Sequence, residues 1–333
     1  MKERIEYIDL AKGVCIMLVV FYHASGMLGC TYWLSPFLDS FRLPLYFVLA
    51  GLFFRDYGSV KTFLVKKTNR LLVPFFAFYL VFSVIMPNLL HCMAGIEFGT
   101  VVGWNSLWAF VWPGEYPNVP IWFLWCLFVM NVMFWGVRAV SLLLFERYGQ
   151  LAVFVMSFVL CMLGYSLQDL VGADVATLFK AMQSMPYFCI GYILGVSNGL
   201  KVLDGMSTAK KSAVALVLVA LTFVVSMRMA YYSDYVGMLA GVLGALMIIT
   251  FSSIVKRIPF VSYLGRYSII LLLTHGLLLR LMFPVCQWVA TNSTPYMAVV
   301  VTTVLTMLSY LAIIPLSCKF IPQITAQRPL LNE

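Results

Sequence analysis

The stretch LAKGVCIMLVVFYHAS, residues 10–25, determines how the rest of this sequence has to be interpreted. Two ionisable residues interrupt its apolar run, Lys12 near the start and His23 near the end. A helix needs about 20 mostly apolar residues to cross a bilayer, and residues 8–28 supply them. The stretch therefore predicts a membrane-spanning helix that carries two ionisable side chains.

The composition extends this interpretation to the whole chain. Hydrophobic residues fill 62% of the 333 positions and charged residues only 11%, whereas a soluble domain has about 25% charged residues. The apolar segments follow one another with no soluble module between them, so residues 1–333 are expected to form one transmembrane domain. The predicted fold is an all-α integral membrane protein, a bundle of about ten transmembrane helices. The spans are expected near residues 8–28, 40–55, 70–91, 120–143, 150–166, 178–197, 212–229, 233–255, 266–284 and 295–317.

Lysine and arginine are distributed unevenly between these spans. They occur before the first span, in every second connection and after the last span, and the alternate connections contain none. The positive-inside rule then predicts that both termini are cytoplasmic. The net charge of +9 is therefore a topology signal, and nucleic acid is not an expected partner. The expected location is the cytoplasmic (inner) membrane of a bacterial-type cell, with many crossings.

Lys12 and His23 are eleven residues apart, which corresponds to about three full helical turns. Both therefore project from one helix face, roughly 16 Å apart along the axis. Ionisable groups inside a span cost at least a few kcal/mol and by default mark a functional path. Each residue also has a purely structural explanation, since Lys12 can snorkel to the interface and a histidine can join helices by hydrogen bonds.

Other ionisable residues lie near the same path. Asp39 and Arg42 stand at the outer end of the second predicted span, at a depth not far from His23. Asp39 can orient or charge-pair the imidazole, or it can simply cap a helix. His275 falls near the middle of the ninth predicted span.

A basic cluster, Lys66, Lys67 and Arg70, stands at the cytoplasmic foot of the third predicted span. Lys67 and Arg70 are three apart, so they are neighbours on a helix face. The positive-inside rule alone explains the cluster as a topology determinant. A phosphate cradle is the alternative, because lysine and arginine at this spacing suit a phosphorylated ligand.

The connection 92–119 is the one sizeable outer loop, and it is rich in tryptophan. An aromatic belt at the membrane interface is the ordinary explanation. The alternative is a stacking platform for a sugar, with polar groups such as Glu115 fixing its orientation.

Six segments occur along the chain in the order YIDLAKGVCIMLVVFYH, FRLPLYFVLAGLFF, VKKTNRLLVPF, IWFLWCLF, YFCIGYILG and LGRYSIILLLTHG. In content and order they resemble the acyltransferase 3 family of membrane O-acyltransferases, including fucose 4-O-acetylase-like members. Two positions depart from the family pattern. Lys12 stands where an arginine is usual, and Lys67 replaces the first of two paired arginines. Lysine keeps the charge but lacks the planar fork of arginine.

The resemblance implies transfer of an acyl group, usually acetyl, from cytoplasmic acyl-CoA to a hydroxyl of a cell-surface polysaccharide or lipid-linked sugar. Acyl-CoA is then the donor substrate, and neither a permanently bound cofactor nor a metal ion is expected. His23 would be the general base, a task that suits a free imidazole pKa of about 6.5. Asp39 would orient His23, and Arg42 would stabilise the oxyanion or hold the acceptor. The resemblance assigns acyl-CoA to Lys12, Lys66, Lys67 and Arg70, and the substrate to Glu115, Trp122 and His275.

Other interpretations stay open from the residues. His23 can itself be acylated and then pass the group on. A ten-span exporter of a sugar-like or anionic solute is the alternative function, although the sequence lacks a convincing internal repeat. A membrane sensor or assembly protein without chemistry is a third. A homodimer is compatible with all of these, and membrane lipids are expected partners.

Overall fold

The computed structural model describes residues 4–95, 102–112, 119–172, 175–228 and 234–332. Every regular element among these residues is a helix, and eight helices of this part of the chain are long and apolar enough to cross a membrane. The prediction of an all-α membrane protein is confirmed, while ten crossings and cytoplasmic termini stay predictions. The eight are α1 (Glu6–Met27), a helix from Val60 to Ala94, α7 (Trp122–Leu144), α8 (Gly149–Val171), α12 (Thr208–Met227), α13 (Asp234–Val255), α15 (Ser268–Asn292) and α16 (Pro295–Phe320).

The two remaining predicted spans, 40–55 and 178–197, each consist of two short helices. The backbone breaks at Leu43 and at Ser184, and prolines follow at Pro44 and Pro186. Proline lacks the N–H of a helical bond, and its ring clashes with the carbonyl four residues earlier. Both predicted spans are therefore discontinuous. Their helices are α2 (Ser35–Arg42), α3 (Pro44–Leu52), α9 (Leu178–Gln183) and α10 (Met185–Val196).

The chain forms two compact units. Unit 1 contains residues 1–53 and 191–315, and unit 2 contains residues 54–190 and 316–333. Each unit is described by itself below.

Glycines set the closest helix contacts of unit 1. A Cβ at Gly13 of α1 would collide with the backbone carbonyl of Val261, which belongs to α14 (Pro259–Arg266). A Cβ at Gly265 of α14 would likewise collide with the Asp9 carbonyl of α1. The two helices therefore touch backbone to backbone, and this contact fixes α1 beside its neighbour.

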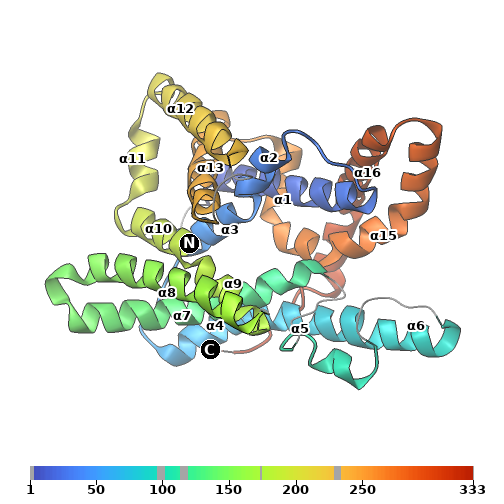
Figure 1. The fold of residues 1–333 in the computed structure, drawn as a ribbon, viewed down its shortest axis with the longest axis horizontal. Helices are drawn as coiled ribbons and strands as arrows, with labels where there is room; N and C mark the ends of the chain where they lie inside the picture. Colours follow the sequence, from blue (N-terminus) through green and yellow to red (C-terminus); the bar gives the residue numbers. More distant parts are fainter. Residues whose placement is uncertain (1–3, 96–101, 113–118, 173–174, 229–233, 333) are drawn as a thin grey trace. The chain divides into compact units, whose positions relative to one another are not determined.

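Glycine contacts of the same kind join α3 to the part of α10 that lies in unit 1. A Cβ at Gly191 would collide with the Val48 carbonyl, and one at Gly195 would lie 2.7 Å from the Leu52 carbonyl oxygen. Small residues permit such close approach, and membrane helices associate largely through this kind of packing. Unit 1 also contains α12 and α13, which pack side by side (Figure 1).

In unit 2, α7 and α8 form an antiparallel pair, drawn in green in Figure 1. The long helix from Val60 to Ala94 is wider than an α-helix in two places. Pro74 and Pro87 explain both, because a proline ring clashes with the carbonyl four residues earlier and a π turn relieves the clash. The successive segments are α4 (Val60–Lys67), the π segment η1 (Thr68–Leu72), α5 (Val73–Tyr79), the π segment η2 (Leu80–Ile85) and α6 (Met86–Ala94).

Candidate functional site

Two histidines of unit 1 lie ring against ring. His23 of α1 and His275 of α15 have ring centroids 5.1 Å apart, with their planes tilted by 47°. His275 is fully buried, at 0% exposure, while His23 is half-buried. Two residues that lie at opposite ends of the sequence therefore share one site.

The hydrogen bond of His275 fixes its tautomer. Its Nδ1 lies 2.8 Å from the Leu271 carbonyl oxygen, and a carbonyl can only accept, so Nδ1 carries the proton. The other ring nitrogen, Nε2, is then an acceptor in the neutral ring. It is buried and has no hydrogen-bond partner among the described residues. An unmatched buried acceptor costs free energy, so a donor that reaches Nε2 is stabilised there. An N–H of His23 or a hydrogen-bond donor of a ligand can fill this role.

Lys12 and His23 lie on one continuous helix, since α1 is unbroken from Glu6 to Met27. Lys12 is half-buried, and its backbone carbonyl accepts a hydrogen bond of 2.8 Å from the Tyr46 hydroxyl. Tyr46 belongs to α3, so this bond joins α1 to the discontinuous helix at the level of Lys12.

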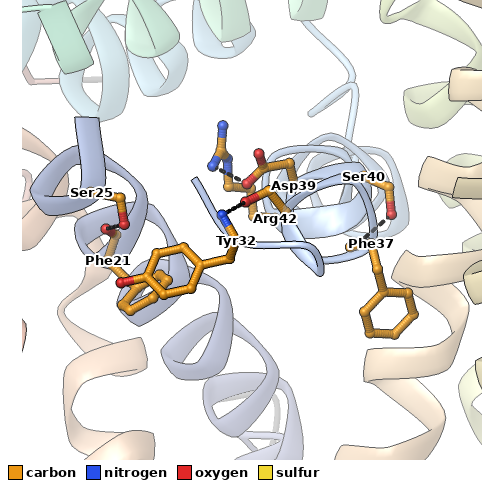
Figure 2. Close-up of polar contacts among 8 residues, drawn as sticks. Phe21, Ser25, Tyr32, Phe37, Asp39, Ser40 and Arg42 are labelled. Atoms are coloured by element: carbon orange, nitrogen blue, oxygen red, sulfur yellow. Dashed lines mark hydrogen bonds and ion pairs between the residues drawn. The ribbon is translucent and has the colours of Figure 1, made fainter. Parts of the chain in front are cut away.

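Asp39 and Arg42 form an ion pair on α2, which Figure 2 shows beside the end of α1. The Arg42 guanidinium also lies over the Tyr22 ring, 3.4 Å from its centre, and Tyr22 contacts His23 edge-on at 5.4 Å. These contacts therefore link Asp39 to His23 through Arg42 and Tyr22. A residue that orients an imidazole hydrogen-bonds it directly, and here the ion pair with Arg42 takes up the Asp39 carboxylate.

A cavity of about 270 Å³ lies between the C-terminal end of α1 and α2. Figure 2 shows part of its wall, with the Tyr32 ring on one side and Asp39 on the other. Aromatic faces, hydroxyls and one carboxylate line this cavity. They come from Tyr22, Tyr32, Ser25, Ser35 and Asp39.

Unit 2 has a basic cavity of about 470 Å³. Its cations come from three places in the sequence: Lys66 and Arg70 from α4 and η1, Arg55 from the connection before α4, and Arg328 from the segment after α16. The described lining residues include no carboxylate. The arrangement fits an anion with several charges.

Lys67 points elsewhere. Its Nζ lies over two aromatic rings, 5.7 Å from the centre of Phe54 and 5.6 Å from the centre of Phe63. Lys66 and Lys67 are four and three residues from Arg70, so helical spacing makes either one its neighbour. Of the two, Lys66 lines the cavity together with Arg70.

The remaining candidates lie apart from these groups. Trp122 begins α7 in unit 2, where the Nζ of Lys180 lies 5.3 Å from its ring centre. Glu115 lies outside the described residues. Within the described part of the chain, no group of three or more His, Cys, Asp or Glu side chains could hold a metal ion.

These features define a class: a helical protein with many apolar helices of membrane-crossing length, a buried histidine pair and a basic cavity. Residues 5–318 match the acyltransferase 3 family, whose model is described as an acyltransferase domain. The match covers most of the chain, and the chain therefore belongs to this family of membrane acyltransferases. Comparisons with curated proteins and with solved structures returned no match. The predicted enzyme class is confirmed at the level of an acyltransferase.

Proposed function

We propose that this protein moves an acyl group, with acetyl expected, from cytoplasmic acyl-CoA to a hydroxyl of a cell-surface polysaccharide or lipid-linked sugar. The observation that carries the proposal is the contact between His23 and the buried His275, in a chain that belongs to an acyltransferase family. The expected setting is the cytoplasmic membrane of a bacterial-type cell.

His23 is the proposed general base. If one His23 nitrogen donates its N–H to the empty Nε2 of His275, the other nitrogen has a free lone pair. That lone pair takes the proton of the acceptor hydroxyl as its oxygen attacks the thioester carbonyl. The C–O bond forms, the C–S bond breaks, and the imidazolium returns the proton to the departing thiolate. His275 is then a positioning residue, in the way that a third group orients the base of a catalytic triad.

Arg42 contacts Tyr22, which in turn contacts His23, and we assign Arg42 to the developing oxyanion or to the acceptor. The cavity beside Tyr22 is the proposed acceptor subsite. Aromatic faces with a few hydroxyls and a carboxylate suit a sugar, whose faces stack and whose hydroxyls need partners.

The donor phosphates are assigned to the basic cavity of unit 2. The 3′-phospho-ADP part of CoA carries three phosphate groups, and Lys66 and Arg70 present cations to a cavity of suitable size. Lys67 is assigned to the donor from the family pattern alone, since its Nζ lies over the Phe54 and Phe63 rings and not in the cavity lining. Lys12 is expected to act on the donor from its half-buried position on α1.

The test is acyl transfer by the purified, reconstituted protein, from radiolabelled acetyl-CoA to envelope glycan. His23→Ala is expected to abolish transfer while the protein stays monodisperse and still binds CoA. His91→Ala is the matched control, because His91 is exposed at the end of α6. Undiminished transfer by His23→Ala would overturn the assignment. Solute flux across the vesicles, with neither transfer nor CoA binding, would favour an exporter instead.

A further inference from the structure

Residues 321–332, the tail, follow α16 and fold back onto the π segment η1. Gln327 and Arg328 both donate backbone N–H groups to the Pro322 carbonyl, at 2.8 and 3.0 Å. Ala326 adopts a φ of 58°, in the left-handed region that a residue with a Cβ rarely enters. A chain end without a defined position would relax from this conformation, so specific contacts hold the tail in place.

Asn69 supplies those contacts. Its Nδ2 donates to the Leu331 carbonyl at 2.9 Å, and its Oδ1 accepts the N–H groups of Leu330 and Leu331 at 2.9 and 2.8 Å. The Asn69 side chain is buried, at 7% exposure, within η1. Three hydrogen bonds from one buried amide therefore fix the backbone of the tail.

The three hydrogen bonds of Asn69 place Arg328 at the basic cavity. The tail supplies part of the cavity lining together with Lys66 and Arg70, and Arg328 is among its lining residues. The tail also lies beyond residues 5–318, so the family match does not account for it.

We propose that the tail helps to bind a ligand with several phosphates in the basic cavity of unit 2. Arg328 contacts a phosphate, and Asn69 is a positioning residue that holds Arg328 in place. The ligand class is a nucleotide with several phosphates, as in the 3′-phospho-ADP end of CoA. The proposal rests on the proposed function for the identity of the donor. What it adds is Arg328 as a further phosphate contact and Asn69 as the residue that holds Arg328 in place. An anionic lipid headgroup offers similar chemistry near a membrane surface, and the test separates the two.

The experiment measures binding of CoA and of 3′-phosphoadenosine 5′-phosphate by calorimetry, with the full chain in phosphatidylcholine nanodiscs. Arg328→Gln is expected to weaken both ligands about tenfold or more, because it removes a charge-assisted contact. Arg328→Lys should recover part of the loss, since it keeps the charge. Lys319→Gln is the control: it removes a charge from the exposed end of α16, outside the cavity lining.

Asn69→Leu tests the positioning role in combination with Arg328→Gln. If Asn69 acts by holding Arg328 in place, the double variant binds CoA as weakly as Arg328→Gln alone. Additive losses would overturn the positioning role, because a general loss of structure adds to any other defect. Since Arg328 is exposed, its own variants should fold whether or not Asn69→Leu does.

The outcomes separate the two proposals. CoA affinity that falls in Lys66→Gln and Arg70→Gln but not in Arg328→Gln overturns the role of the tail and leaves the donor site standing. CoA affinity unchanged in all three overturns the donor site itself. The nucleotide assignment is wrong if Arg328→Gln leaves nucleotide binding intact but removes the thermal shift caused by adding phosphatidylglycerol to the nanodiscs.

Discussion

Replacing His275 by phenylalanine isolates the role of the histidine pair. The variant keeps a ring of similar size in a fully buried position, but it removes both nitrogens. The variant loses the bond from Nδ1 to the Leu271 carbonyl and the proposed bond from His23 to Nε2, each worth about 1 kcal/mol. The folded state is therefore expected to lose about 2 kcal/mol of stability.

The catalytic effect should be larger than the effect on stability. Without the acceptor at Nε2, nothing on His275 selects the tautomer of His23. A positioned general base contributes about 10²–10⁴ to the rate, so losing its orientation is expected to lower kcat about 100-fold, or about 2.7 kcal/mol. The KM for acyl-CoA should change little, because the cations assigned to the donor are untouched.

The assay is steady-state acetyl transfer in nanodiscs, with Tm followed by the intrinsic fluorescence of the eight tryptophans. His91→Phe serves as the control at an exposed histidine. If kcat in His275→Phe stays within about twofold of the parent while Tm is unchanged, His275 is a packing residue and the proposed orientation of His23 is wrong.

Two further predictions concern other parts of the chain. The double variant Lys66→Gln with Arg70→Gln should raise the KM for acyl-CoA about tenfold or more and leave the KM for the acceptor nearly unchanged. If it changes only the orientation of the protein in the membrane, the basic cluster is a topology determinant. Gly191→Ala should lower stability by about 1–3 kcal/mol, measured as Tm, whereas Gly205→Ala, where an added Cβ meets nothing within 4 Å, should not.

The sequence predicted the membrane helices well because hydropathy acts locally. The helix that carries Lys12 and His23 is continuous, as the apolar run between them required. The break at Leu43 also has a local cause, the proline that follows it, although a hydropathy count joins the two short helices into one span.

The candidate site was less accessible from sequence, because its geometry depends on contacts between distant residues. Nothing near His23 in the sequence points to His275 as its ring partner. Helical spacing makes both Lys66 and Lys67 neighbours of Arg70, and only the packed structure shows that Lys66 is the one that lines the cavity with it. Arg328 was counted only as a topology charge, and Asn69 carried no signal at all.

The glycine contacts of α1 with α14 and of α3 with α10 have a consequence for assembly. In a bilayer, helices form first and associate afterwards, so the backbone is already ordered when two helices meet. A contact made by glycine against backbone orders no side chain, and the rotamer entropy that bulky residues lose on packing is not lost there. The helix contacts around Lys12 can therefore form after the helices themselves and still be rigid. The dispersion attraction between the backbones is opposed by only a small loss of side-chain entropy.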